Sequence, residues 1–210
     1  QMNPHFIYNA LNAIQGYITD GKVTNASTYL AQFAELMRSS LEFSDKESLL
    51  LEEEIAFLTD YLDISQKLRY KNAFSYEINV DDELEEDILC VPSMIVQPYV
   101  ENALEHGLRS IKNGHVSVDF EYVDEQSLLC VIEDNGIGRD KAAQYNRSKK
   151  RNDKHRPRGT KITEDRLKLL DNSNKPQYPV KTIDLFDKKT NVPIGTRVEV
   201  IIPIVDIKID

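Results

Sequence analysis

The sequence predicts an α+β protein whose first third is helical and whose remainder combines helices with a mixed, mostly antiparallel sheet. Up to about residue 69, apolar residues recur at the three- and four-residue spacing of amphipathic helices. From residue 74 on, short segments alternate apolar and polar residues as strands do. The change falls near Lys71, so we expect a helical region over residues 1–70 and an α/β region over residues 71–210.

Periodicity also predicts the individual elements. In the first region we expect helices over 4–19, 24–43 and 52–69. In the second we expect two further helices, over 94–108 and about 162–171, and an acidic turn or loop over 81–87. A polar, basic stretch over 141–161 shows no periodicity and is predicted to be a long loop. The predicted strands are 74–80, 115–123, 127–134, 180–186 and 196–205.

Composition excludes several classes of protein. A chain of 210 residues with 40% hydrophobic and 29% charged residues is an ordinary soluble globular protein. No apolar run approaches the roughly 20 residues of a membrane span. Cys90 and Cys130 both lie in apolar, strand-like stretches, which predicts buried, reduced thiols and a cytosolic compartment. Because the chain starts at Gln1 and runs at once into a motif, we expect it to be a fragment of a longer protein.

The charge is unevenly distributed along the chain. The net charge of −9 argues against a general nucleic-acid-binding protein. Residues 147–161 nevertheless hold eight Lys or Arg and one Asp, a local charge of +7 that leaves −16 for the rest. A basic segment on an acidic protein indicates one particular anionic ligand, although a solvated charged loop is the plain alternative.

The stretch "NPHFIYNALNAI" (3–14) raises the question of what His5 does. On a helical wheel the apolar residues of 6–18 share one arc, and His5, Asn9 and Asn12 gather on the opposite side. His5 therefore faces away from the core, on a firm helix. A metal site is unlikely here, because no His, Cys or carboxylate follows at the third or fourth position. A neutral imidazole is a nucleophile, yet a solvent-facing histidine without a role fits the same pattern.

Two later stretches contain side chains or glycines in patterns that suggest a binding site. In "PYVENALEHG" (98–107), Asn102 and His106 lie four residues apart on one helix face, next to carboxylates. Mg²⁺ takes few protein oxygens and keeps phosphate and water ligands, so one amide with a nearby carboxylate suits it, as would a plain surface cluster. In "IEDNGIG" (132–138), Asp134 ends a strand before two glycines that permit close approach of a ligand. Asn-Gly is also a common hairpin turn.

Together, these motifs resemble those of the LytS/YehU-type bacterial sensor histidine kinases joined to a GHKL-type ATPase domain. "QMNPHFIYNALNAI" is similar to the phosphoacceptor box, "PSMIVQPYVENALEHG" to the N box, "IEDNGIG" to the first glycine box and "GTRVEVIIP" to the closing strands. The resemblance covers residues 1 to about 203, and the first two boxes are highly specific together.

The resemblance implies roles for individual residues. His5 would receive the γ-phosphoryl group of ATP, Asn102 would hold Mg²⁺, and Glu101 would lie close to the metal and its water. Asp134 would recognise adenine, with Gly136 and Gly138 shaping the pocket. The other residues that the resemblance places at the nucleotide are His106, Lys154, Arg158, Gly159, Thr160 and Thr196.

The resemblance also implies a fold and partners. The fold would be a GHKL (Bergerat-type) α/β sandwich with helices on one face of the sheet, preceded by a helical phosphoacceptor and dimerisation region. The chain would be the cytoplasmic kinase portion of an inner-membrane sensor. It would form a homodimer, use ATP and Mg²⁺, phosphorylate itself on histidine and pass the phosphoryl group to an aspartate of a response regulator. Nucleic acid would not be a partner.

Two departures from the family pattern leave other functions open. The second glycine box is reduced to Gly159, which favours a lid that binds phosphate through side chains, or a weak nucleotide site. The residue after the phosphoacceptor is Phe6, not an acid. The rival hypotheses are a nucleotide-binding pseudokinase or scaffold, and a GHKL ATPase that acts without the histidine acceptor.

Overall fold

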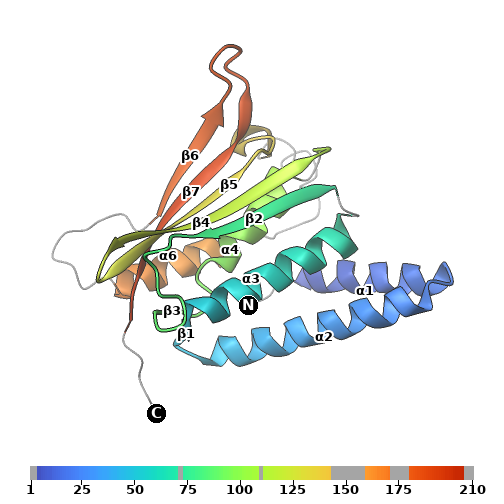
Figure 1. The fold of residues 1–210 in the computed structure, drawn as a ribbon. Coiled ribbons are helices and arrows are strands. Elements are labelled where there is room, and N and C mark those ends of the chain that lie inside the picture. The colour runs from blue at the N-terminus through green and yellow to red at the C-terminus, as the bar shows by residue number, and fades with distance from the viewer. Residues whose placement is uncertain (1–3, 71–72, 109–110, 143–158, 171–179, 206–210) are drawn as a thin grey trace.

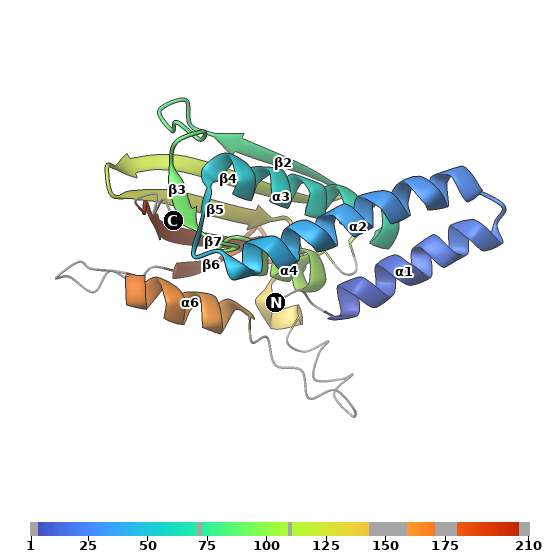
Figure 2. The same ribbon diagram turned by 90° about the horizontal axis from the view of Figure 1, so that it is seen from below.

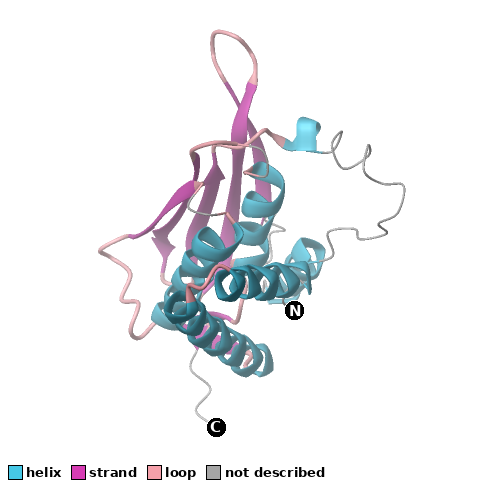
Figure 3. Cartoon of the chain, turned by 90° about the vertical axis from the view of Figure 1, so that its right-hand side faces the viewer, coloured by secondary structure: helices cyan, strands magenta, loops and turns pink. Residues whose placement is uncertain are grey.

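The computed structural model describes residues 4–70, 73–108, 111–142, 159–170 and 180–205. A single layer of strands is covered on one side by helices, as Figure 1 and the side view in Figure 3 show. The class predicted from the sequence, α+β with a mixed and mostly antiparallel sheet, is confirmed.

The main sheet has the strand order β2-β4-β5-β7-β6. β2 runs parallel to β4, and the other neighbouring pairs are antiparallel. The helix-covered face is apolar because alternate residues of β4, β5 and β7 point to it, such as Phe120, Cys130 and Val200. These strands are β2 (Phe74–Val80), β4 (Gly114–Asp124), β5 (Ser127–Asp134), β6 (Val180–Phe186) and β7 (Pro193–Pro203).

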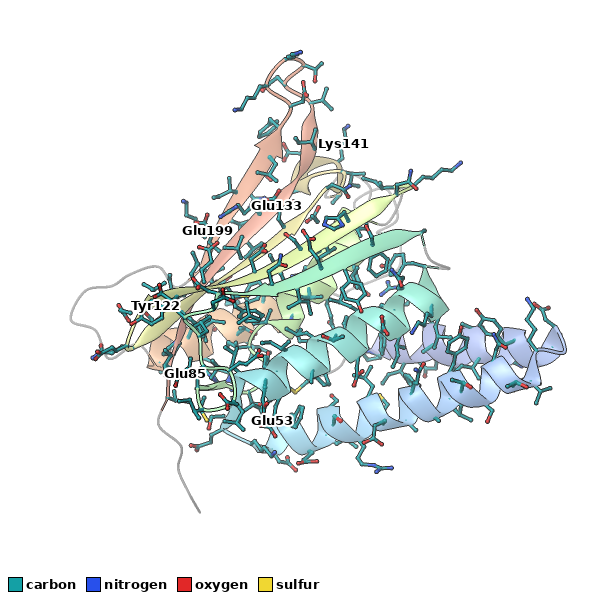
Figure 4. The ribbon with its side chains drawn as sticks, viewed as in Figure 1. Glu53, Glu85, Tyr122, Glu133, Lys141 and Glu199 are labelled. Carbon is teal, nitrogen blue, oxygen red and sulfur yellow. The ribbon has the colours of Figure 1, made fainter. Side chains whose placement is uncertain are left out.

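The opposite face of the sheet carries charged side chains. Arg197 lies 3.5 Å from Glu133 and 3.0 Å from Glu199, and Lys181 lies 3.3 Å from Glu199. Figure 4 labels both glutamates on the side of the sheet that faces away from the helices. This alternation of charged and apolar positions explains why the strands were predictable from the sequence.

The helical region is a hairpin of α1 (Pro4–Thr19) and α2 (Val23–Asp45), followed by α3 (Leu51–Ile64) against the sheet (Figure 2). The buried ring of Phe6 holds them together: its centroid lies 6.2 Å from that of Phe33 on α2 and 4.8 Å from that of Tyr61 on α3. α3 continues into η1 (Ser65–Arg69), a wider π-helical turn in which the Tyr70 N–H donates to the Ser65 carbonyl. The predicted helices 4–19 and 24–43 are confirmed, and 52–69 is helical with this wider end.

The helix predicted over 94–108 starts later than expected. It begins as α4 (Gln97–Asn102) and continues as a second π-helical turn, η2 (Ala103–Gly107). Met94 has a φ of 53°, outside the helical range. The backbone N–H groups of Met94 and Val96 donate to the Glu54 carboxylate at 2.9 and 3.1 Å, so a side chain replaces the helical turn that the apolar pattern suggested.

Other element ends differ by a few residues. α6 (Gly159–Leu170) begins three residues before the predicted helix, so Gly159–Lys161 are not part of a loop; a first turn needs no apolar residue and escapes periodicity. β7 covers 193–203, not 196–205. Two short strands, β1 (Ser48–Leu50) and β3 (Cys90–Pro92), pair with each other and were not predicted as a pair, since three residues show no period. Lys141 and Ala142, the first residues of the predicted loop 141–161, are also helical, and residues 143–158 of it lie outside the described residues.

One apolar core joins the two predicted regions. It runs from Phe6 and Leu58 through Val100 and Leu104 to Val118 and Ile132. The division between residues 70 and 71 therefore stays a prediction from the sequence pattern. Cys90 and Cys130 are both buried and free, as predicted. In the part of the chain that the structure describes, no helix has the length and apolar character needed to cross a membrane.

Glu54 is fully buried, and its burial raises its pKa to about 7, although the N–H groups of residues 94–96 and the charge of Arg166 act in the opposite direction. The native state therefore holds a proton that the unfolded chain loses above its ordinary pKa of 4.5, so this group's stabilising contribution is lost as pH rises toward 7. Glu54→Gln removes this titration. We expect the fall in unfolding free energy between about pH 5 and about pH 7.5 to be roughly 2 kcal/mol smaller in the variant.

Urea unfolding at the two pH values measures this difference. The matched control is Glu52→Gln, because Glu52 lies on the same helical turn but is exposed. The control should keep the wild-type pH dependence. Equal pH dependence in wild type and Glu54→Gln would contradict the assignment.

Candidate functional site

Asp134 is a buried carboxylate at the end of β5. It continues the apolar row of Leu128, Cys130 and Ile132 on the helix-covered face, and only 5% of its surface is exposed. Its Oδ1 accepts the Gly136 N–H at 2.8 Å. Burial raises the pKa of Asp134 to about 6, while hydrogen bonds from the backbone of Gly136 and Thr196 lower it. The strand period thus places one acceptor where an apolar residue would otherwise lie.

Three glycines let neighbouring backbone pack closely against Asp134. A Cβ on Gly107 would lie 2.6 Å from Asp134 Oδ1. A Cβ on Gly136 would collide with the same oxygen and with the Gly107 backbone, and one on Gly195 would collide with the Asp134 carbonyl. The Ile137 N–H donates to the Gly107 carbonyl at 3.1 Å, so the end of η2 and the loop after β5 are in direct contact. Only glycine permits this close approach.

The alternative of a plain Asn-Gly hairpin turn is wrong. β5 has β4 on one side and β7 on the other, so the chain after Asn135 does not fold back beside it. Asn135 instead fixes the loop: its Oδ1 accepts the His115 N–H at 2.7 Å, and its Nδ2 donates to the Asn113 carbonyl at 3.3 Å. Gly138 has a φ of 76°, a conformation that glycine favours, and the loop passes beside Pro193 there.

The residues of the 98–107 motif lie on the helix that meets Asp134. Asn102 is the last residue of α4, and Glu101 precedes it and accepts a hydrogen bond from Gln97 Nε2 at 3.1 Å. His106 lies in η2, where the wider turn changes its angle relative to Asn102 from that of a regular helix. The predicted shared face of Asn102 and His106 stays a prediction.

His5 lies against the same π-helical turn. Its Nδ1 is 3.6 Å from Glu105 Oε1, and 61% of its side chain is exposed. The same oxygen accepts a hydrogen bond from Arg69 Nη2 at 3.0 Å. Asn9 Nδ2 lies 3.3 and 3.4 Å from the two ring nitrogens of His5. His5 is therefore exposed, as the wheel predicted, but it is not isolated.

The other predicted nucleotide residues are only partly described. Thr196 lies on β7 directly opposite Asp134 and is almost buried. Gly159 and Thr160 begin α6, which packs through Thr163 and Leu167. Lys154 and Arg158 lie outside the described residues. Of the predicted set, the structure brings Asp134, Gly136 and Thr196 together.

Sequence reasoning missed three contributors to this region. Gly107 and Gly195 stood inside the quoted motifs, but nothing in their spacing indicated contact with Asp134. Arg69 reaches Glu105 across 36 positions of the chain, for which the sequence holds no signal. A metal can be tested against the donors present: among the described residues, no three His, Cys, Asp or Glu side chains form a metal-binding group. Asn102 and Glu101 fit Mg²⁺ held mainly by phosphate and water, and not a metal held by protein alone.

Comparisons with known proteins agree with this geometry. Residues 1–74 match the family model described as histidine kinase. Sensor protein LytS of Staphylococcus epidermidis is 31% identical over 139 residues, which are 66% of this chain and 23% of that protein. Sensor histidine kinase YpdA of Escherichia coli is 33% identical over 116 residues, 55% of this chain and 20% of that one.

A solved structure shares the fold. The histidine kinase domain of the blue-light activated histidine kinase from Erythrobacter litoralis EL346 superimposes with a TM-score of 0.51 at 16% identity, over 83% of this chain and 74% of that chain. The matches in sequence place the chain among the histidine kinases. More closely, it belongs with the LytS-type sensor histidine kinases, as the motifs predicted. The chain spans less than a quarter of the length of these curated relatives.

The close approach at Gly107 gives a stability prediction. Gly107→Ala would place a methyl group against Asp134 Oδ1, and we expect it to lower the free energy of unfolding by about 2 kcal/mol. Gly16→Ala is the matched control, because Gly16 is also helical and has no atom within 4 Å of the added carbon. It should be neutral or stabilising by up to roughly 1 kcal/mol. Urea unfolding measures both, and equal effects would refute the contact.

Proposed function

We propose that this chain is the cytoplasmic kinase portion of a two-component sensor, which phosphorylates itself on His5 from ATP and passes the phosphoryl group to an aspartate of a response regulator. One observation carries the proposal: a single helical segment, α4–η2, contacts Asp134 at its end and His5 through Glu105. A nucleotide bound at Asp134 and the acceptor His5 would thus both lie next to this segment. The sensor names of the curated relatives support this reading.

Asp134 is suited to recognise a base. A buried carboxylate accepts a hydrogen bond from an amino group such as that of adenine, and its remaining bonds to Gly136 and Thr196 hold it in place. Gly107 and Gly136 let the surrounding backbone pack directly against the carboxylate, and Gly195 packs against the Asp134 carbonyl, so the acceptor is held in one place. Thr196 lies beside the carboxylate and can contribute a further polar contact.

The phosphates would extend from Asp134 toward α4. Asn102, with Glu101 nearby, would hold Mg²⁺, which supplies charge neutralisation on the phosphates when bound. Gly159 and Thr160 at the start of α6, with the basic residues that precede it, would meet the phosphate oxygens through side chains and the helix N-terminus. His106 would contact the nucleotide from η2. Positioning and charge neutralisation carry most of the catalysis in phosphoryl transfer.

Autophosphorylation tests the proposal directly. With γ-labelled ATP and Mg²⁺, we expect acid-labile, base-stable label on the wild type and none on His5→Gln. Asn102→Ala and Asp134→Asn should lose label through loss of metal and base binding, by at least about 100-fold. His115→Gln is the control, since the His115 side chain faces Ser75 and Glu77 on the other sheet face.

Each outcome separates the rival functions. Label that survives in His5→Gln would move the acceptor elsewhere and favour a GHKL ATPase without the histidine acceptor. ATP binding without label, in a chain that is shown to be dimeric, would favour a pseudokinase.

We further propose that the α1–α2 hairpin pairs with a second copy. Both helices expose large apolar residues away from the core, namely Tyr8, Leu11, Ile18, Leu30 and Leu41. Exposed apolar residues that recur along two neighbouring helices are typical of an interface. A homodimer through this hairpin would bury them beside His5. The proposed membrane attachment would come from a sensor region upstream of this chain.

Size-exclusion chromatography with light scattering tests the dimer. Leu11→Glu with Leu30→Glu should shift a dimeric wild type to monomer, because two charges would have to be buried in the interface. Ile88→Glu is the control, since Ile88 is also exposed but lies between β2 and β3, outside the hairpin. A variant that stays dimeric would place the interface elsewhere.

A further inference from the structure

The candidate phosphoacceptor lacks an acid directly after it in sequence, yet the fold supplies one. Position 6 is a buried phenylalanine that packs into the helical core, so it cannot act on the imidazole. Glu105, 100 positions further along the chain, places Oε1 at 3.6 Å from His5 Nδ1. A carboxylate is therefore aimed at one particular ring nitrogen of His5.

Glu105 is held firmly where it meets His5. Arg69 Nη2 donates to Glu105 Oε1 at 3.0 Å, and the guanidinium of Arg69 stacks over the Tyr70 ring at 5.1 Å. The Tyr70 hydroxyl donates to the Leu104 carbonyl at 2.7 Å, next to Glu105. The two π-helical turns, η1 and η2, thus lock together through neighbouring residues. Such turns often occur at functional sites, because they re-aim side chains.

We propose that Glu105 is a positioning residue for His5: its carboxylate, 3.6 Å from Nδ1, favours the ring form with hydrogen on Nδ1 and so leaves the Nε2 lone pair for the phosphoryl group. This inference rests on the proposed function, in which His5 is the acceptor. A neutral imidazole carries one hydrogen, and the nitrogen that faces a carboxylate is the one that keeps it. Arg69 holds the Glu105 carboxylate in place through its hydrogen bond.

The transfer step balances with this geometry. The Nε2 lone pair forms the new bond to the γ-phosphorus, the bond from that phosphorus to the β,γ-bridging oxygen breaks, and ADP leaves with the electron pair. The ring then carries a positive charge with hydrogen on Nδ1. Glu105 stabilises that charge and takes the Nδ1 proton, which passes on to water. Asn9 Nδ2 lies 3.3 Å from Nδ1 and 3.4 Å from Nε2, so this side chain must move aside when the phosphorus approaches Nε2.

Two measurements test the proposal, one of which does not depend on kinase activity. In ¹⁵N-histidine-labelled chain, the ring signals of His5, identified by their loss in His5→Gln, should show the Nδ1–H form. In Glu105→Ala they should change to the Nε2–H form that free imidazole favours. In the labelling assay, Glu105→Ala should lower kcat about tenfold, less than the roughly 100-fold of a full general base because the pair is exposed, with the KM for ATP unchanged.

The chain offers a matched control and a graded variant. Glu77 faces the Nε2 of His115 at 3.5 Å in another exposed histidine–glutamate pair, on β2 and β4. Glu77→Ala should alter the His115 ring signals and leave both the His5 signals and kcat unchanged. Glu105→Gln should fall between wild type and Glu105→Ala, because its amide oxygen still accepts the Nδ1–H but carries no charge.

The outcomes separate this inference from the proposed function. A wild type that is labelled on His5, with Glu105→Ala equal to it in kcat and ring signals, would overturn the inference and leave the kinase intact. A raised KM with unchanged kcat would also overturn it, and would assign Glu105 to the nucleotide. A wild type without label on His5 would refute the proposed function, while the ring signals would still decide whether Glu105 sets the tautomer.

Discussion

The candidate site depends on where residues 93–97 lie, and the buried carboxylate of Glu54 fixes that position. It binds the backbone N–H groups at the start of the α4–η2 segment, so α3 and this segment cannot shift independently. Arg166 of α6 reaches the same place through the Ser93 carbonyl at 3.1 Å. Burying the Glu54 side chain without these N–H donors would cost folding free energy. Glu54 and the N–H groups of residues 94 and 96 must therefore be in place together. The residues of α4–η2, including Glu105 and Gly107, are therefore positioned by the contact with Glu54.

The residues of α4–η2 make contacts in two directions. Toward the sheet, Gly107 lets the Asp134 carboxylate pack directly against the backbone of η2. Toward the helical hairpin, Glu105 meets His5 and Arg69. The wider turn of η2 permits both contacts from residues only two positions apart. A regular helix over 94–108 would have rotated these side chains differently.

The two candidate groups therefore rely on opposite environments. Asp134 is buried, and its raised pKa of about 6 still leaves it mostly charged at neutral pH, held by backbone donors. His5 is exposed and reachable, and its orientation is set by a charged neighbour instead of by burial. Burial suits recognition of a base, since water would compete for the same hydrogen bond. Exposure suits the proposed acceptor, which the two proposed partners, nucleotide and response regulator, would have to reach.

The sequence by itself determined the fold class, most of the helices and long strands, and the family, because these rest on periodicity and on motifs that are local in the chain. It also placed His5 on the exposed side of its helix and Asp134 at a strand end. The tertiary structure was needed to show that Glu54 replaces the first turn of the 94–108 helix, that Gly107 and Gly195 border Asp134, that Glu105 lies against His5 and that Arg69 binds Glu105. These contacts join residues 27 to 100 positions apart, from Gly107 with Asp134 to His5 with Glu105. Pairings at such separations depend on how whole elements pack, and no local pattern records them.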